Sequence, residues 1–405
     1  MLTQDQITIV KSTVPLLESA GPAITQHFYQ RMFSHNPELK DIFNMSHQQS
    51  GGQPLALFNA IAAYAKYIDN LPALTSAVER IAHKHTTFDI QPEQYDIVGH
   101  HLIQTLKELA PDAFTAEVED AWVAAYQQLA DIFIGREAEI YQANARAKGG
   151  WQGARLFKVQ DKNQESELVT SFILVPVDGQ PVVDFKPGQY LGIRLQPDSS
   201  DYQEIRQYSL SDRANGSSYR ISVKREGIQE TSSQPGIVSN YLHDHVEVND
   251  ELELFAPAGD FFFTDHQRPV VAISAGVGLT PMISIVETLA AQQYKQPVFF
   301  LHACENRAQH SFARRIHELG ECLPLSNHIW YRNADSAESN APLNLNIHHG
   351  LMQLNKIKQQ LPLENGDFYL CGPVAFMQFA KQQLLELGVD QSRIHYEVFG
   401  PHQDF

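Results

Sequence analysis

The sequence predicts a multidomain protein in which an all-α domain precedes an antiparallel β-barrel and then an α/β domain built on a parallel sheet. Apolar residues recur at helical spacing in the first third, short β-rich runs follow a glycine-containing break at residues 148–153, and strands alternate with helices after residue 268. A chain of 405 residues can give each domain its own core. We expect domains at residues 1–147, 151–264 and 268–405.

The composition favours small-molecule ligands. The chain has 30 Lys+Arg and 47 Asp+Glu, a formal net charge of −17, and no local basic patch. The one long uncharged stretch, residues 269–286, contains Gly276, Gly278 and Pro281, so it predicts a strand, a turn and a helix rather than a membrane span. We therefore expect no nucleic-acid partner and no transmembrane segment, and nothing implies an obligatory protein partner.

Cysteine usage and the N-terminus predict a cytoplasmic protein. Cys304, Cys322 and Cys371 are odd in number and lack CxxC spacing, which argues against a disulfide scaffold or a zinc cluster and fits a reducing compartment. The first residues contain no cationic segment followed by an apolar one, so no secretory signal is expected. Thr3 with Gln6 instead predicts a helix cap.

A short helix over residues 76–85 places a histidine on its apolar face. That face is formed by Val78, Ile81, Ala82 and His85. Ser76 and Glu79 predict a capping box at its start, whereas His83 faces the other way. His85 therefore points inward, where neutral imidazole is a good iron ligand; the alternative is a hydrogen-bonded core histidine.

Two further helices bring a carboxylate and a phenol to the same interior. Glu137 continues the apolar stripe of the last long helix, and Tyr95 lies on the inner face of a helix opened by Pro92. Beside His85 they could hydrogen-bond its far nitrogen and strengthen electron donation to iron. The alternatives are a helix-end glutamate that reaches water and an ordinary core tyrosine.

Tyr29 and Gln53 are candidates for the opposite side of such a pocket, where either could donate a hydrogen bond to dioxygen. Tyr29 could equally be a core residue, and Gln53 could be a helix cap. Pro54 directly after Gln53 affects how that helix begins.

The run from His27 to Met45, His-Phe-Tyr-Gln-Arg-Met-Phe-Ser-His-Asn-Pro-Glu-Leu-Lys-Asp-Ile-Phe-Asn-Met, strongly resembles the globin domain of bacterial and yeast flavohemoglobins, the nitric oxide dioxygenases. The resemblance implies that His85 is the proximal heme ligand and that Tyr95 and Glu137 form the charge-relay pair behind it. It also implies roles for the distal residues Tyr29, Gln53 and Leu57, the heme wedge Phe43, and Lys84 beside the ligand. Without it, Phe43 would be ordinary core and Lys84 an ordinary surface lysine.

The barrel region carries three segments that suit a flavin. Arg206-Gln-Tyr-Ser209 offers a guanidinium for pyrophosphate, an aromatic ring and a hydroxyl for the flavin. Pro187-Gly-Gln-Tyr190 precedes it, and Gly236-Ile-Val-Ser239 follows it as a glycine turn into a helix whose N–H groups can hold phosphate. The alternative is a barrel strand with an ordinary loop.

The last region carries a glycine turn between a strand and a helix. The turn residues are Gly276, Val277, Gly278, Leu279, Thr280 and Pro281, and Thr280 is expected to cap the helix. A second segment after a later strand is Cys371-Gly-Pro373, where the nicotinamide should lie.

The order of these motifs resembles the ferredoxin-NADP reductase superfamily, and the run from His395 to Pro401 resembles the flavohemoglobin C-terminus. The resemblance implies an FAD-binding barrel and an NAD(P)-binding α/β domain, with Glu397 near the flavin. The implied FAD-binding residues are Tyr190, Arg206, Gln207, Tyr208, Ser209, Gly236, Ser239, Val398, Phe399, Gly400 and Pro401. The implied NAD(P)-binding residues are Gly276 to Pro281 with Cys371, Gly372 and Pro373.

The resemblance implies a nitric oxide dioxygenase with heme b, FAD, and NADH or NADPH as cofactors. NAD(P)H reduces FAD, FAD reduces the heme iron, and the heme converts NO and O2 to nitrate. Two alternatives stay open: an oxygen carrier or sensor with an attached reductase, and a flavin-dependent reductase of quinones, ferric chelates or hydroperoxides. The run Glu305-Asn306-Arg307 contains both an acidic and a basic residue, and we modestly favour NADH over NADPH.

Overall fold

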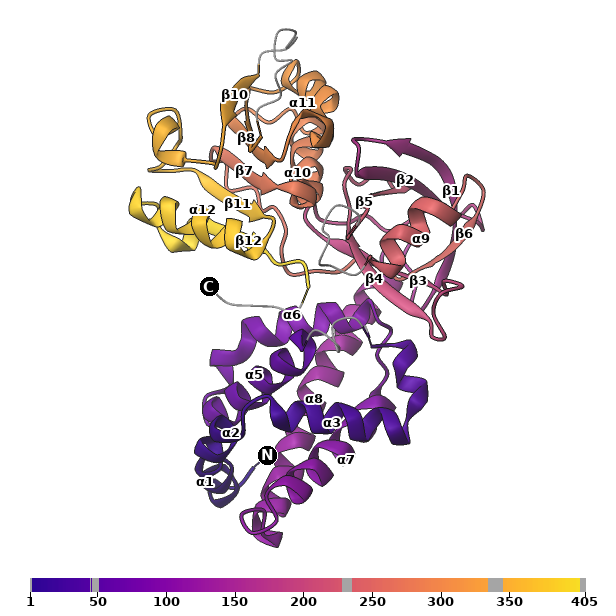
Figure 1. The fold of residues 1–405 in the computed structure, drawn as a ribbon, viewed down its shortest axis with the longest axis vertical. Coiled ribbons are helices and arrows are strands. Elements are labelled where there is room, and N and C mark those ends of the chain that lie inside the picture. Colours follow the sequence, from indigo (N-terminus) through magenta and orange to yellow (C-terminus); the bar gives the residue numbers. More distant parts are fainter. Residues whose placement is uncertain (1, 44, 46–50, 228–234, 334–344, 401–405) are drawn as a thin grey trace.

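The computed structural model describes residues 2–43, 45, 51–227, 235–333 and 345–400, so the predicted site residue Pro401 lies outside the described residues. Three lobes follow one another along the chain (Figure 1). The helical domain occupies one end of the molecule, and the barrel and the parallel-sheet domain lie side by side at the other end.

The helical domain is built from long helices around one core. Its elements are α1 (Gln4–Ser12), α2 (Val14–Ala20), α3 (Ala23–His35), α5 (Gly52–Tyr67), α6 (Thr75–Thr86), α7 (Pro92–Leu109) and α8 (Ala116–Arg146). The predicted cap of α1 is confirmed, because Thr3 and Gln6 form a complete capping box. Phe28, Met32 and Trp122 are fully buried in the core of this domain.

The capping box predicted for α6 is wrong. The helix begins after Leu74, and no side chain caps it. Glu79 instead accepts two hydrogen bonds from the Arg136 guanidinium of α8, at 2.6 and 2.9 Å. Because the helix already begins at Thr75, Ser76 lies inside its first turn and not at the N-cap position, and Glu79 is held by the bidentate ion pair with another helix.

The barrel is a six-stranded antiparallel sheet in the order β4-β3-β6-β1-β2-β5. Its elements are β1 (Arg155–Gln164), β2 (Val169–Pro176), β3 (Tyr190–Leu195), β4 (Glu204–Ser209), β5 (Tyr219–Lys224), α9 (Ile237–His245) and β6 (Glu251–Leu254). A bridge between Leu210 and Ile221 joins the two end strands, as in a closed barrel. Alternation along β5 sends Ile221 into the barrel core and Arg220 to the opposite face.

The parallel-sheet domain has strand order β10-β9-β8-β7-β11-β12. Its strands are β7 (Val270–Ala275), β8 (Val298–Cys304), β9 (Leu325–Tyr331), β10 (Asn346–His349), β11 (Asp367–Cys371) and β12 (Ile394–Glu397). Its helices are α10 (Leu279–Ala291), α11 (Ala313–Gly320) and α12 (Val374–Glu386). Helices α10 and α11 pack on one face of the sheet and α12 on the other, which is the arrangement expected of a parallel sheet.

The predicted role of Thr280 as a cap of α10 is wrong. The helix begins one residue earlier, at Leu279, and no side chain caps it. Thr280 lies within its first turn and donates a hydrogen bond to the carbonyl of Val277 at 3.0 Å.

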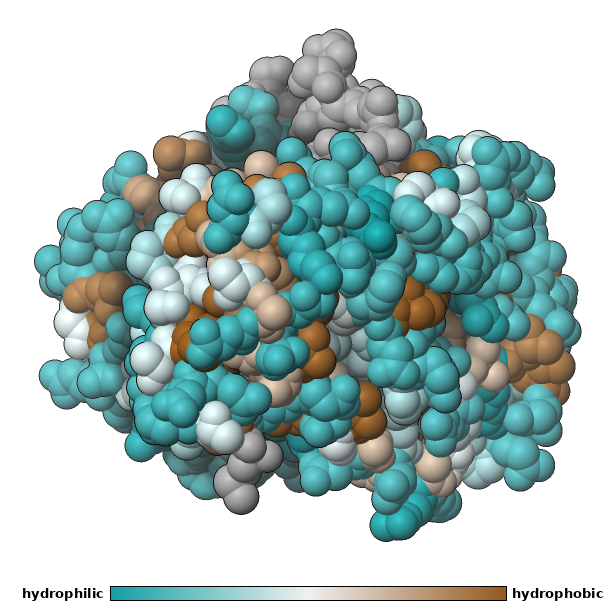
Figure 2. Space-filling view, turned by 90° about the horizontal axis from the view of Figure 1, so that it is seen from below, coloured by the Kyte–Doolittle hydropathy of each residue, from teal (hydrophilic) through white to brown (hydrophobic). Residues whose placement is uncertain are grey.

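The surface of the helical end shows no broad apolar face. Figure 2 shows brown apolar patches there that are divided by teal hydrophilic residues. Among the residues that the structure describes, no helix is both long and apolar enough to cross a membrane.

Candidate functional site

One cavity of about 1540 Å³ is lined by residues of all three domains. Most small-ligand pockets have volumes of ~300–1,000 Å³, so this cavity has room for more than one large organic group. Its helical-domain wall includes His85 and Tyr95, its barrel wall Arg206 and Tyr208, and the parallel-sheet domain contributes Val277.

The predicted group of His85, Tyr95 and Glu137 is assembled at one end of this cavity. His85 Nδ1 lies 2.7 Å from Glu137 Oε1 and 2.9 Å from the Tyr95 hydroxyl. Tyr95 itself donates a hydrogen bond to Glu137 Oε1 at 2.5 Å. Burial, and then the charge of Glu137, raise the pKa of Tyr95 well above its ordinary value, so the phenol keeps its proton.

These contacts fix which ring nitrogen of His85 carries a proton. An ionised carboxylate can only accept, and the Tyr95 proton is already directed to Glu137, so His85 Nδ1 must be the donor. The neutral ring then has its lone pair on Nε2. His85 lines the cavity, and its remaining nitrogen has the chemistry of a metal ligand with a carboxylate behind it.

The residues predicted for the other side of the pocket also line the cavity. They are Tyr29, Phe43, Gln53 and Leu57. The Tyr29 and Phe43 rings pack edge to face, with centroids 5.7 Å apart. Gln53 lies in the first turn of α5, and Pro54 is accommodated there because an N–H group in the first turn of a helix has no acceptor within the helix, so proline loses no hydrogen bond. An apolar slot with one basic nitrogen and few polar groups fits a heme.

Most of the predicted flavin residues line the barrel part of the same cavity. They are Tyr190, Arg206, Gln207, Tyr208, Ser209, Gly236, Ser239, Glu397, Val398, Phe399 and Gly400. Helix α9 begins after Gly236 beside the cavity, and the N–H groups of its first turn, which have no acceptor within the helix, lie where a phosphate could accept from them. The Arg206 guanidinium lies 2.8 Å from the buried Glu204 carboxylate, which holds it in place. Gln207 also donates to Thr87 Oγ1 of the helical domain at 2.6 Å.

The glycine turn of the parallel-sheet domain packs against the second predicted segment. A Cβ on Gly278 would lie 2.4 Å from the backbone of Cys371, so only glycine allows this approach. Gly276 has a positive φ of 54° and open space around its missing side chain, which leaves room for a phosphate. The structure thus brings residues 276–281 and 371–373 together, with Val277 and Thr280 at the cavity wall.

Lys84 and Glu397 lie where the three domains meet. Lys84 Nζ donates to the carbonyl of Gly400 at 2.6 Å. Burial raises the pKa of Glu397 to about 8, Asp260 acts in the same direction, and Lys84 opposes it. Burial also lowers the pKa of Lys84, with Glu397 opposing.

The sequence analysis missed the contacts that join the helical domain to the barrel. His83 Nδ1 accepts a hydrogen bond from the backbone N–H of Gly259 at 3.2 Å, and Arg80 lies 3.6 Å from Asp260. Both pairs span more than 170 residues. Because such pairing follows from domain docking, no local spacing could have indicated it.

The chain matches known families along most of its length. A family model of globins matches residues 26–133, one of oxidoreductase FAD-binding domains residues 156–263, and one of oxidoreductase NAD-binding domains residues 272–382. A flavohemoprotein of Vibrio cholerae is 60% identical over 402 residues, covering 99% of each chain.

Two solved structures are similar. One is the FAD/NAD-binding domain of nitric oxide dioxygenase from Vibrio cholerae O1 biovar El Tor, at 51% identity and a TM-score of 0.57, covering 62% of this chain and all of that one. The other is the flavohemoglobin of Malassezia yamatoensis with bound FAD and heme, at 27% identity and a TM-score of 0.84, covering 98% of this chain and all of that one.

Proposed function

The chain belongs to the flavohemoglobin family, and on that premise we propose that it is a nitric oxide dioxygenase that converts NO and O2 to nitrate with electrons from NAD(P)H. It is an NAD(P)H-dependent oxidoreductase with a globin domain, an FAD-binding barrel and an NAD(P)-binding domain. Its cofactors are heme, FAD and a nicotinamide nucleotide. The observation that carries the proposal is the network of His85, Tyr95 and Glu137, which suits activation of dioxygen better than its storage.

When bound, FAD converts the electron pair of NAD(P)H into single electrons, and heme iron uses them to activate dioxygen toward NO. The chain's residues bind and orient the reactants. His85 Nε2 would hold the iron, while Glu137 and Tyr95 accept the proton on Nδ1. Tyr29 and Gln53, which line the same cavity, would donate hydrogen bonds to dioxygen. The apolar neighbours Phe43 and Leu57 exclude water from that side.

The reductase residues hold the electron source against the same cavity. Arg206 and the start of α9 would bind the pyrophosphate of FAD, and Tyr208 and Ser209, which line the same cavity, would contact its ring. The turn from Gly276 to Pro281 and the segment from Cys371 to Pro373 would hold the nicotinamide nucleotide. Since one cavity includes His85 and Tyr208, the heme and flavin sites are not separated by a wall of side chains.

We favour NADH over NADPH as the electron donor. Glu305 follows directly on β8, and its carboxylate contacts Arg332 at 3.2 Å and Asn333 at 3.0 Å. At the end of the second strand of such a domain, a carboxylate can accept from a ribose hydroxyl and would repel a 2′-phosphate. A cytoplasmic location is also part of the proposal, because Cys304, Cys322 and Cys371 are all free thiols.

The test is an NO electrode in aerated buffer with purified protein replete with heme and FAD, with and without NADH, followed by a nitrate assay. We expect rapid NO loss that requires NADH and yields an equal amount of nitrate. Retention of dioxygen with little NO loss would instead indicate a carrier or sensor. NADH oxidation with quinones or hydroperoxides that survives heme removal, without NO loss, would indicate a flavin reductase.

A further inference from the structure

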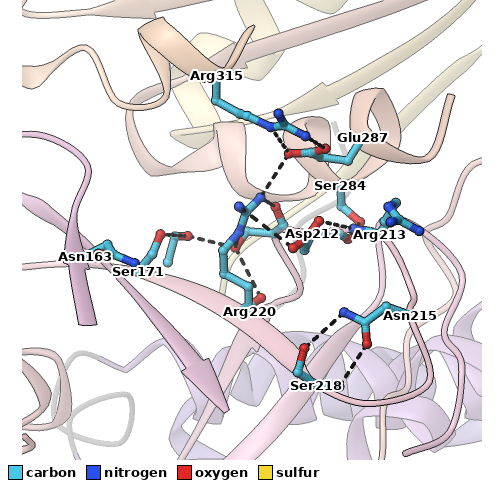
Figure 3. Close-up of polar contacts among 12 residues, drawn as sticks. Asn163, Ser171, Asp212, Arg213, Asn215, Ser218, Arg220, Ser284, Glu287 and Arg315 are labelled. Carbon is cyan, nitrogen blue, oxygen red and sulfur yellow. Dashed lines mark hydrogen bonds and ion pairs between the residues drawn. The ribbon is translucent and has the colours of Figure 1, made fainter. Parts of the chain in front are cut away.

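A buried polar network joins the FAD-binding barrel to the NAD(P)-binding domain (Figure 3). At its centre, the Glu287 side chain of α10 is only 3% exposed. Arg315 of α11 donates to both of its oxygens at 2.7 Å, and Arg220 of β5 approaches it from the barrel at 3.5 Å. Glu287 thus lies between two guanidinium groups, one from each domain.

Arg220 makes two contacts across the domain boundary. Besides Glu287, its guanidinium covers the Phe312 ring, 5.0 Å from the ring centre. Within the barrel it donates to the Ser211 carbonyl and lies 3.9 Å from Asp212. These contacts within the barrel therefore fix the orientation of the guanidinium plane that Arg220 presents to the other domain.

A second contact between the two domains lies one turn earlier on α10. Ser284 Oγ donates to the backbone carbonyl of Asp212 at 2.6 Å. The hydrogen bond of Ser284 connects α10 to the short segment Ser211–Asp212, and Arg220, which contacts Glu287 of α10, also donates to this segment. Figure 3 shows Asp212 lying between Ser284 and Arg220.

Each end of this network adjoins one of the two proposed cofactor sites. Helix α10 begins directly after the glycine turn Gly276–Gly278, and Ser211–Asp212 follows β4, which ends at Ser209 of the flavin segment. On the same face of β5 as Arg220, Ser222 lines the cofactor cavity and its hydroxyl contacts Ser211 Oγ at 2.7 Å. A shift of α10 against this segment would therefore move the nucleotide turn relative to the flavin strand.

We infer that Arg220 and Glu287 form a positioning pair that sets the distance between the nicotinamide and the flavin for hydride transfer. In that step a C–H bond of the reduced nicotinamide breaks, both electrons and the hydrogen pass to the flavin, and a proton from water completes flavin reduction. Neither Arg220 nor Glu287 gains or loses a proton. The inference rests on the flavin and nucleotide sites of the proposed function, and it is independent of what the heme does.

The test is anaerobic stopped-flow reduction of the FAD-loaded full-length protein by NADH, followed by flavin absorbance. Arg220→Gln removes only the barrel's member of the network, because the Glu287 and Arg315 pair lies within one domain. A displacement of about 1 Å can cost ~10²-fold in rate, so we expect a loss of about that size in the reduction rate at saturating NADH. The dissociation constant of NADH should stay within about twofold. Arg220→Lys should recover part of the rate.

A spectroscopic readout separates positioning from structural support. The long-wavelength charge-transfer absorbance between nicotinamide and flavin should weaken in Arg220→Gln, because it requires close contact of the two rings. Ser284→Ala, which loses one hydrogen bond, should show a smaller loss in the same direction and covers the case in which Arg220→Gln does not fold. Arg314→Ala is the matched control, because Arg314 neighbours Arg315 but its side chain is 93% exposed and pairs with Glu318 on its own helix.

Unchanged reduction rates and charge-transfer absorbance in both variants, with only a lower melting temperature, would overturn the inference. A higher dissociation constant at an unchanged saturating rate would also overturn it. Because neither NO nor O2 is present, failure of the NO assay would leave this test intact.

Discussion

Glu137 and Glu287 are buried to the same extent, yet their partners give them different tasks. Each side chain is only 3–4% exposed and lies on a helix that packs in its domain's core. Glu137 accepts hydrogen bonds from the His85 ring and from the Tyr95 hydroxyl. Glu287 is held by Arg315 and approached by Arg220, so its charge is balanced across a domain boundary.

The difference shows what a buried carboxylate can do. With an imidazole and a phenol as donors, the charge of Glu137 is directed to the ring of His85 and raises the basicity of its other nitrogen. With two arginines, the charge of Glu287 is neutralised and fixes geometry instead. Substitutions of the two carboxylates and of their partners should separate these two uses of the same side chain.

The largest effect is expected for His85→Ala. The variant loses the nitrogen that Glu137 orients, so we expect loss of bound heme and of NO turnover. Heme content by pyridine hemochromogen absorbance and NO loss at an electrode measure both. His100→Ala is the control, because His100 is an exposed residue on α7. Retention of heme and turnover in His85→Ala would contradict the assignment of His85 as the heme ligand.

Glu287→Ala should have the next largest effect, on stability. Removing Glu287 takes away the buried carboxylate that faces both guanidinium groups and leaves Arg220 with its longer 3.9 Å contact to Asp212, so we expect a cost of about 3 kcal/mol of unfolding free energy. Urea unfolding followed by circular dichroism measures it. Glu318→Ala is the control, since Glu318 pairs with Arg314 and Arg315 while 40% exposed, and exposed pairs contribute ~0–1 kcal/mol. Equal losses in the two variants would show that burial does not distinguish these carboxylates.

Glu137→Gln should affect chemistry more than stability. The amide can still accept from His85, but it carries no charge, so we expect heme to be retained and turnover to fall about 10–100-fold. The measurement is NADH-dependent NO loss per heme. Glu139→Gln is the control, because the Glu139 side chain is 70% exposed and pairs with Arg136. Wild-type turnover in Glu137→Gln would contradict the role given to this carboxylate.

The sequence predicted one of these carboxylates and not the other. Glu137 interrupts an apolar stripe, and periodicity alone placed it, Tyr95 and His85 in one interior. Arg220 looked like an ordinary polar residue of an alternating strand, and its partner lies 67 residues away in another domain. Local spacing does not encode domain docking, which is also why the pairing of His83 with Gly259 was missed. The pairing of Glu79 with Arg136 was missed because it depends on how α6 packs against α8 within one domain.

The comparison extends to a buried histidine whose described contacts are with neutral groups. His302, on β8, is 1% exposed and its Nδ1 contacts Ser274 Oγ at 2.9 Å. Burial, and then the neighbouring His310, lower its pKa from 6.5 to about 3. His302 therefore stays neutral in the folded protein at pH values where an unfolded histidine is charged.

The smallest effect is accordingly a pH dependence of stability that originates in the NAD(P)-binding domain. Below pH 6.5 the unfolded chain binds a proton at His302 that the folded chain does not, so stability is full above this pH and is lost as the pH falls toward 3. The slope is at most about 1.4 kcal/mol per pH unit for this residue. In His302→Gln, the unfolding free energy should depend less on pH between about pH 6 and 5, and its slope should fall by less than that amount. His349→Gln, at an exposed position of the same domain, is the control for the substitution itself. If the wild type and His302→Gln lost stability in parallel over this range, the acid sensitivity would come from other groups. His302 would then not be the neutral buried histidine described above.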